Sequence, residues 1–125
     1  MKEGMNIMIV EDDPTNALAL SAVLRKHKPI LSFAINGNDC IDKLSVDENT
    51  ELILLDLMMP EMDGYQTLDY IRNNVRTMHI PVIIITARTS RGEKERAIKQ
   101  GANAYITKPI ELDCLMHAIT EICNQ

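Results

Sequence analysis

Residues 52–64 have the sequence LILLDLMMPEMDG. The four apolar residues 52–55 form an uninterrupted run of strand length, which is typical of a strand covered on both faces, as in a parallel sheet. Asp56 follows this run at once and precedes a loop that contains Pro60 and Gly64. We therefore place Asp56 at the carboxyl edge of a sheet, where open α/β sheets bind their ligands.

The length and composition of the chain indicate one globular domain. The chain has 125 residues, of which 46% are hydrophobic and 25% are charged, and this length suits a single core. We therefore expect one domain over residues 1–125, with its core from about residue 6 to residue 122. No apolar run has the length of a transmembrane helix, so we expect no membrane insertion.

Charge and cysteine content narrow the class of protein further. The net charge of -5 argues against direct binding of nucleic acid, because nucleic-acid-binding surfaces are normally basic. The three cysteines are an odd number, and the N-terminus lacks the pattern of a secretory signal peptide. A cytoplasmic protein with reduced thiols is the simplest interpretation.

Other short apolar runs alternate with helical patterns along the chain. The expected strands are residues 7–10, 30–34, 52–55, 81–86 and 104–107. The expected helices begin at Pro14, after a turn at residues 36–38, at Tyr65, at a capping box formed by Ser90 and Glu93, and near Leu112. This strict alternation predicts an α/β fold, in which a doubly wound parallel sheet has helices on both faces.

The residues that end or follow these strands carry the polar chemistry of the chain. They are Glu11 and Asp12 after the first strand, Asp56 after the third, Thr86 at the end of the fourth and Lys108 after the fifth. Parallel strands finish at the same edge of a sheet, so these side chains would share a small volume. Clustered carboxylates resist ionisation unless a cation is present, and Mg²⁺ suits a few carboxylates together with waters and a phosphate. The acidic cluster therefore indicates half of a phosphoryl-transfer site.

In order and spacing, these motifs resemble the signature of the receiver domain of two-component response regulators. The matching motifs are Glu11-Asp12, the segment that starts at Asp56, Thr86-Ala87 and Lys108-Pro109. The resemblance extends from about residue 6 to residue 122. It implies a single-domain (βα)5 fold whose five parallel strands have the flavodoxin-like order 2-1-3-4-5.

The resemblance also implies a role for each acidic residue. Asp56 would be the nucleophile that takes a phosphoryl group from the phosphohistidine of a sensor histidine kinase or histidine phosphotransfer protein. Asp12, Asp56 and the backbone carbonyl of Met58 would ligate Mg²⁺, and Glu11 would hold the ion through water. The protein would be a signalling switch that catalyses only its own phosphorylation and dephosphorylation.

The same resemblance assigns other residues to charge stabilisation and switching. Lys108 would pair with Asp56 at rest and with a phosphoryl oxygen afterwards, and the peptide bond before Pro109 would be cis. Thr86 would hydrogen-bond another phosphoryl oxygen, and Tyr105 would then move inward. The output would be a change of downstream protein partner at the face formed by the fourth helix, the fifth strand and the fifth helix.

Simpler interpretations stay open for several positions. Asp13 stands beside the acid pair, but its place before Pro14 favours an N-cap over a metal ligand. Taken alone, Thr86 would be a β-branched strand residue, Lys108 a solvated lysine and Tyr105 ordinary core packing.

Two further groups of residues favour structural explanations. The cysteine and histidine spacing near the C-terminus lacks the second ligand pair of a metal site. The basic residues of segment 88–99 are interrupted by acidic ones, which favours a solvated helix face over a docking surface for an acidic partner. The residues concerned are Cys114, His117 and Cys123 in the first group, and Arg88, Arg91, Lys94, Arg96 and Lys99 in the second.

Three other functions fit the sequence less well. A degenerate receiver that is never phosphorylated and acts only as an interaction module would not need the intact set of acids, threonine and lysine. A phosphatase of the haloacid dehalogenase type would need a second Asp at Met58, and a dinucleotide binder would need a Gly-rich turn at residues 11–14. We therefore predict a phosphorylatable receiver domain.

Overall fold

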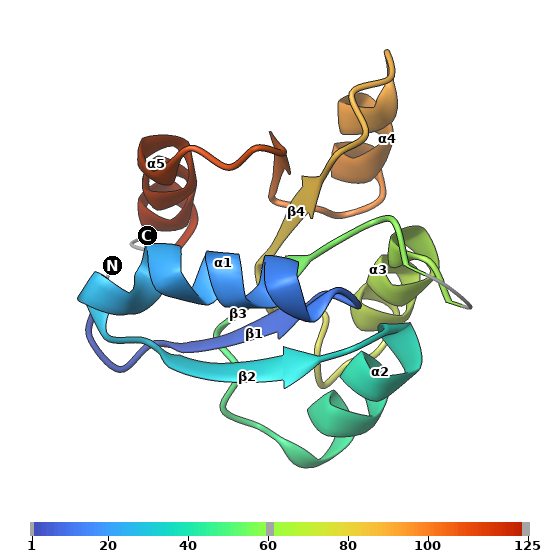
Figure 1. Ribbon diagram of the computed structural model, residues 1–125. Helices are drawn as coiled ribbons and strands as arrows, with labels where there is room; N and C mark the ends of the chain where they lie inside the picture. The colour runs from blue at the N-terminus through green and yellow to red at the C-terminus, as the bar shows by residue number, and fades with distance from the viewer. Residues whose placement is uncertain (1, 60–61, 124–125) are drawn as a thin grey trace.

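The structure is a computed structural model that describes residues 2–59 and 62–123 (Figure 1). Pro60 and Glu61, in the predicted loop after Asp56, lie outside the described residues. Strands and helices alternate along the described chain as predicted. The strands are β1 (Asn6–Val10), β2 (Ile30–Ala34), β3 (Leu52–Leu55), β4 (Val82–Thr86) and β5 (Ala104–Thr107). The helices are α1 (Pro14–Leu24), the short 3-10 helix η1 (Arg25–His27), α2 (Gly37–Val46), α3 (Gly64–Arg72), α4 (Glu93–Lys99) and α5 (Leu112–Cys123).

The strands form one parallel sheet in the order β2-β1-β3-β4-β5. The predicted fold class and strand order are therefore confirmed. The chain runs outward from β1 to β2 and then crosses to β3 on the other side of β1. This reversal lies between β1 and β3, and in open α/β sheets ligands bind beyond the strand ends at such a point.

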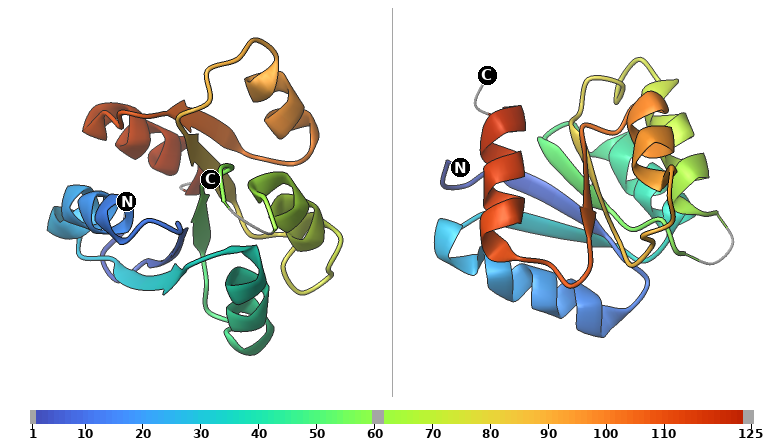
Figure 2. Two further views of the ribbon diagram at one scale, coloured as in Figure 1. Left: turned by 45° about the vertical axis from the view of Figure 1, so that its right-hand side comes forward. Right: turned by 90° about the horizontal axis from the view of Figure 1, so that it is seen from above.

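Helices cover both faces of the sheet, as the left view of Figure 2 shows. Helices α1 and α5 lie on one face, and α2, α3 and α4 lie on the other. Alternate side chains of a strand point to opposite faces, so a central strand between two helical layers must be apolar throughout. Residues 52–55 of β3 are each at most 1% exposed, which explains the uninterrupted apolar run. No helix within residues 2–59 and 62–123 is long and apolar enough to cross a membrane.

Side-chain caps fix the starts of two helices near the carboxyl edge of the sheet. Asp13 accepts a hydrogen bond from the N–H of Thr15 at 2.8 Å, and Pro14 occupies the first position of α1. The N-cap interpretation of Asp13 is therefore confirmed. At α3, the Asp63 carboxylate accepts from the N–H of Gln66, and the Gln66 side chain accepts from the N–H of Asp63. This capping box sets the direction in which the chain leaves the loop after Asp56.

The prediction of a capping box at Ser90 and Glu93 is wrong. Helix α4 begins at Glu93 itself, after Gly92 in the left-handed conformation with φ 89°, and no side chain caps it. The Glu93 carboxylate instead contacts side chains outside its own helix. The predicted turn at residues 36–38 is also displaced, because Asn36 is the N-cap of α2 and the helix begins at the next residue.

Candidate functional site

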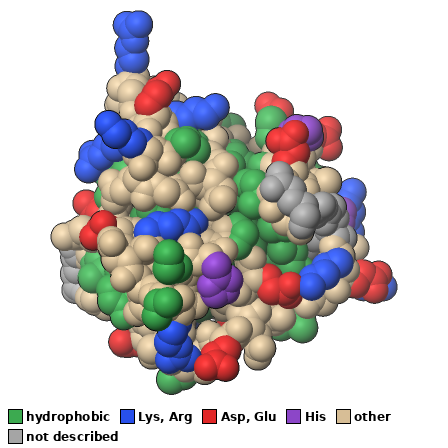
Figure 3. All heavy atoms as spheres, turned by 180° about the vertical axis from the view of Figure 1, so that it is seen from behind, with side chains coloured by type: hydrophobic (Ala, Val, Ile, Leu, Met, Phe, Trp, Pro, Cys, Tyr) green, Lys and Arg blue, Asp and Glu red, His purple; other side chains and the backbone are tan. Residues whose placement is uncertain are grey.

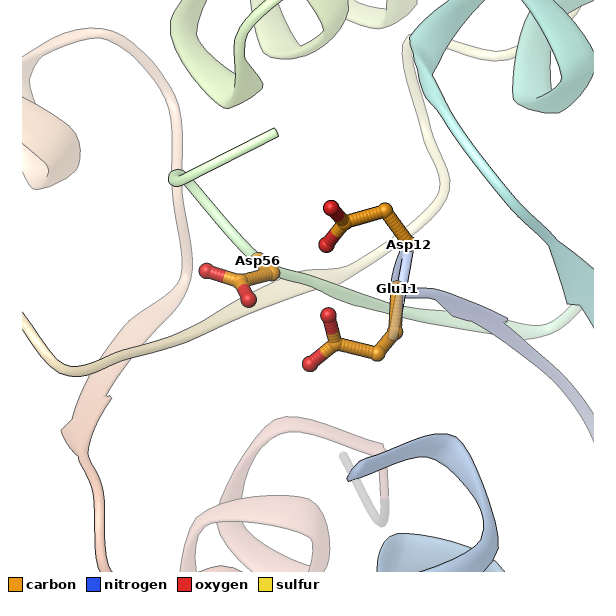
Figure 4. A group of neighbouring side chains, drawn as sticks. All are labelled: Glu11, Asp12 and Asp56. Atoms are coloured by element: carbon orange, nitrogen blue, oxygen red, sulfur yellow. The ribbon is translucent and has the colours of Figure 1, made fainter. Parts of the chain in front are cut away.

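Three carboxylates meet at the carboxyl edge of the sheet, where the strand order reverses. Glu11 and Asp12 follow β1 and Asp56 follows β3, and Figure 4 shows their carboxylates around one common space. Each offers an oxygen atom within 4.8 Å of the others. Glu11 and Asp56 are 8% and 7% exposed, whereas Asp12 is exposed to solvent. The predicted convergence of these acids is confirmed.

Backbone pairing holds Glu11 and Asp56 close to one another. Strands β1 and β3 are neighbours, and Val10 lies opposite Leu55. The N–H of Asp56 donates to the carbonyl of Val10 at 3.1 Å, and the N–H of Glu11 donates to the carbonyl of Ala34 at 3.0 Å. The sheet ladder therefore extends to the first residue beyond each strand. It places Glu11 and Asp56 side by side although their charges repel.

Lys108 supplies positive charge to this cluster. Its Nζ lies 2.8 Å from Oε1 of Glu11 and 3.1 Å from Oδ2 of Asp56. The peptide bond between Lys108 and Pro109 is cis, as the family resemblance implies. The pairing with Asp56 was expected, but the shorter contact with Glu11 was not. Nothing local in the sequence indicates it, because the two residues are 97 positions apart.

Burial and charge compete in setting the protonation of the paired groups. Burial raises the pKa of the Glu11 carboxyl, the hydrogen bond from Lys108 lowers it in part, and the charge of Asp56 adds to the rise. Burial lowers the pKa of Lys108, but its hydrogen bonds to Glu11 and Asp56 outweigh this, so its pKa is raised overall. The ammonium therefore stays charged beside the two acids.

The loop after β3 fixes the second oxygen of Asp56. Oδ1 of Asp56 accepts a hydrogen bond from the backbone N–H of Met58 at 3.0 Å, while the Met58 side chain is 51% exposed. Gly64 lies against the same loop, because a Cβ atom there would be 2.5 Å from Cα of Leu57 and 2.7 Å from the carbonyl oxygen of Asp56. Only a residue without a side chain allows this approach.

Thr86 and Tyr105 lie on neighbouring strands at the same end of the sheet. Thr86 is fully buried and ends β4, and its Oγ1 accepts a hydrogen bond from the N–H of Arg88 at 3.2 Å. Tyr105 of β5 is half-buried, and its hydroxyl donates to the carbonyl of Arg88 at 2.8 Å. Both side chains are therefore hydrogen-bonded to the backbone of Arg88, in the β4–α4 loop. Their switching roles stay predictions.

A second polar cluster next to this loop was not found from the sequence. Tyr65, at the start of α3, donates its hydroxyl hydrogen bond to Glu93, and the guanidinium of Arg88 lies 3.6 Å from the Glu93 carboxylate. Burial and the neighbouring Glu93 carboxylate raise the pKa of Tyr65 to about 12. The capping-box pattern indicated Ser90 as the partner of Glu93, and the true partner is 28 residues away.

The acidic cluster has the donor set that a hard divalent cation requires. Three carboxylates face a single ammonium, so negative charge is in excess, and the exposed Asp12 leaves one side open to solvent. Oxygen donors with room for water ligands suit Mg²⁺. Among the described residues, no other group of three or more Asp, Glu, His or Cys side chains is close enough to hold a metal ion.

Comparison with known proteins agrees with this geometry. The chain matches the family model described as response regulator receiver domain over residues 7–120. It is 34% identical over 116 residues to the protein PilH of Pseudomonas aeruginosa, and the match covers 93% of this chain and 95% of PilH.

Solved structures of receiver domains are similar to this fold. The signal receiver domain of a signal transduction histidine kinase from Syntrophus aciditrophicus is 31% identical, with a TM-score of 0.86 over 96% of this chain and 90% of that chain. The receiver domain of the sensor histidine kinase PA1611 from Pseudomonas aeruginosa PAO1, which has a magnesium ion coordinated in its active site cleft, is 26% identical, with a TM-score of 0.88 over 98% and 99% of the two chains. The family match, the relative and the shared fold agree, and this chain belongs to the response regulator receiver domain family of two-component signalling.

Proposed function

We propose that Asp56 is the phosphoryl acceptor of this receiver domain. One observation carries the proposal: Asp56 lies within 4.8 Å of two further carboxylates, and Lys108 contacts it at 3.1 Å. In the transfer, an oxygen of Asp56 attacks the phosphorus of a phosphohistidine. The new P–O bond forms as the P–N bond breaks, and the imidazole nitrogen keeps the electron pair. The product is an aspartyl phosphate.

The residues around Asp56 stabilise the charge of the phosphoryl group in two ways, through a metal ion and through an ammonium group. Asp12, Asp56 and the backbone carbonyl of Met58 would hold Mg²⁺, and Glu11 would hold it through water. When bound, the ion neutralises negative charge on the phosphoryl group and its acceptor. Lys108 leaves Oδ2 of Asp56 and donates to a phosphoryl oxygen, so its charge follows the transferred group. The exposed position of Asp12 supports a site that stays open to the phosphodonor.

The phosphodonor is a sensor histidine kinase or a histidine phosphotransfer protein. Such a partner presents an imidazole that carries the phosphoryl group, and the receiver supplies the acceptor and the charges that stabilise the transition state. The domain then acts as a signalling switch, and it catalyses only its own phosphorylation and dephosphorylation. The single-domain organisation and the cytoplasmic location expected from the sequence stay predictions.

The response to phosphorylation is read by a downstream protein at the α4–β5–α5 face. Thr86 turns to a phosphoryl oxygen, and Tyr105 moves inward behind it. A groove of about 550 Å³ lies on this face, lined by Lys94 and Ile98 of α4 and by Tyr105 and His117. Figure 3 shows Lys and Arg side chains gathered over α4, at the upper left. The lining of the groove is largely apolar, and Lys94 is balanced by Glu111, so the groove favours a partner segment with apolar side chains.

Beryllofluoride, which mimics a phosphoryl group on a carboxylate, tests this function without a partner protein. We expect the backbone amide signals of Thr86 and Tyr105 to shift and saturate when beryllofluoride is added to the parent protein at saturating Mg²⁺. Asp56→Asn removes the attacking oxygen and should show no response. An unresponsive parent protein would instead favour a degenerate receiver that acts only as an interaction module.

A further inference from the structure

Two side chains of α4 and the side chain of its C-cap residue, Gln100, contact one tyrosine of α3. Tyr65 is 4% exposed, and its hydroxyl donates to Oε2 of Glu93. The guanidinium carbon of Arg96 lies 3.7 Å from the centroid of the Tyr65 ring, and Nε2 of Gln100 donates to the Tyr65 carbonyl at 2.8 Å. Residues three and four apart lie on one face of a helix. This face of α4 is therefore fixed on Tyr65.

Glu93 also holds the loop that precedes α4. Its Oε1 lies 3.6 Å from Nη1 of Arg88, and its side chain is 17% exposed. One carboxylate thus connects the β4–α4 loop to α3 through two different oxygen atoms. Glu95 differs, because it is exposed and makes no side-chain hydrogen bond or ion pair with any described residue. The two glutamates therefore form a matched pair for comparison.

Arg88 links Glu93 to Thr86 and Tyr105, the two residues that are expected to switch. Its N–H donates to Oγ1 of Thr86 at 3.2 Å, and its carbonyl accepts from the hydroxyl of Tyr105 at 2.8 Å. Its side chain pairs with Glu93. A movement of Thr86 toward Asp56 would withdraw the acceptor of the Arg88 N–H. To keep this hydrogen bond, Arg88 would have to move with Thr86, and that movement would break its ion pair with Glu93.

We propose that Glu93 is a positioning residue that sets how readily this receiver switches. The proposal rests on phosphorylation at Asp56 as proposed above. The contacts of Glu93 with Tyr65 and Arg88 hold the β4–α4 loop where Thr86 and Tyr105 take their resting positions. Contacts made in the resting arrangement and broken on switching stabilise the resting arrangement only. Their removal shifts the population toward the switched form.

Beryllofluoride affinity measures this shift, because the ligand binds the switched form preferentially. Glu93→Ala removes both contacts, and Tyr65→Phe removes one hydroxyl and keeps the ring. At saturating Mg²⁺, we expect both variants to reach half-saturation at about fivefold lower beryllofluoride concentration than the parent, which is the lower end of usual coupling energies. Glu95→Ala should match the parent. Without beryllofluoride, the amide signals of Arg88 and Tyr105 in Glu93→Ala should already be displaced toward their bound positions.

A purely structural role for Glu93 gives a different pattern. Glu93→Ala would then lower the melting temperature while its beryllofluoride affinity equals that of Glu95→Ala or falls below it, and this result would overturn the proposal. If Glu93→Ala does not fold, the beryllofluoride affinity of the milder variant Tyr65→Phe is compared with that of Glu95→Ala instead, and an equal or lower affinity overturns the proposal. Failure of the parent protein to bind beryllofluoride would instead overturn phosphorylation at Asp56, so the two failures are distinguishable.

Discussion

Lys108 Nζ lies 3.1 Å from Oδ2 of Asp56 at the carboxyl edge of the sheet. The same ammonium contacts Glu11 at 2.8 Å, so two of the three clustered acids share one positive charge. Asp12 forms no ion pair within residues 2–59 and 62–123, although its carboxylate lies within 4.8 Å of the other two. The three acids therefore differ in how much repulsion each contributes.

Substitution of Asp12 should stabilise the metal-free protein. Asp12→Asn removes an unpaired negative charge, and we expect a gain in the free energy of unfolding on the order of 1 kcal/mol. Asp56→Asn should give a smaller gain, because it also removes a partner of Lys108. Millimolar Mg²⁺ should raise the melting temperature of the parent only. A lower melting temperature for Asp12→Asn in metal-free buffer would contradict a repulsive pocket.

We expect Arg72 to contribute more to the free energy of unfolding than any other arginine in the described part of the chain. It donates from Nε to the carbonyl of Gly101 at 2.8 Å, from Nη1 to the carbonyl of Ile80 at 2.8 Å and from Nη2 to Asn103 at 2.9 Å. These bonds join α3 to the starts of β4 and β5. We expect Arg72→Met to lower the free energy of unfolding by about 2–4 kcal/mol, as measured by urea denaturation.

Arg76 provides the control for Arg72. Its guanidinium pairs with Glu48 at 3.0 Å, and both side chains are largely exposed. An exposed pair contributes about 0–1 kcal/mol, so Arg76→Met should change stability little. Equal losses in the two variants would show that the partly buried hydrogen bonds of Arg72 contribute no more to stability than an exposed ion pair.

Gly64 should be intolerant of any side chain. An added Cβ would lie 2.5 Å from Cα of Leu57 and 2.7 Å from the carbonyl oxygen of Asp56, so the backbone of the acceptor loop would have to move. We expect Gly64→Ala to cost about 1–3 kcal/mol of stability and to weaken the response to Mg²⁺. Thermal unfolding with and without the ion measures both effects. Unchanged stabilisation by Mg²⁺ would mean that the loop tolerates the displacement.

The hydroxyl of Tyr65 should titrate unusually late. Burial raises its pKa to about 12, and the hydrogen bond and charge of Glu93 contribute to the rise. The unfolded chain has a tyrosine pKa of about 10, so between about pH 10 and pH 12 the unfolded state binds fewer protons than the folded state. The free energy of unfolding should therefore fall as pH rises through this window, and fall less in Tyr65→Phe. In Glu93→Gln, the ultraviolet absorbance step of Tyr65 should move to lower pH.

Much of the site follows from local sequence and one geometric rule. The apolar run at 52–55 identifies a central strand, and parallel strands end at one edge, so the sequence alone places Asp56 beside Glu11 and Asp12. The role of Asp13 was also predictable, because an N-cap depends only on the residues that follow it.

The contacts that were not predicted join segments far apart in the chain. The pairing of Lys108 with Glu11 depends on side-chain conformations that no motif specifies. Glu93 satisfied a capping-box pattern, yet Gly92 takes a left-handed conformation and no cap forms there. The carboxylate instead meets the hydroxyl of Tyr65. Local patterns therefore located the strand ends well and the tertiary partners poorly.

Intact-mass measurement after treatment with acetyl phosphate and Mg²⁺ tests phosphorylation at Asp56 most directly. The parent protein should gain the mass of one phosphoryl group, and the gain should disappear when the ion is chelated. Asp56→Asn should gain nothing under the same conditions. A parent protein that stays unmodified, or an Asp56→Asn variant that is modified to the same extent, would contradict the assignment of Asp56 as the phosphoryl acceptor.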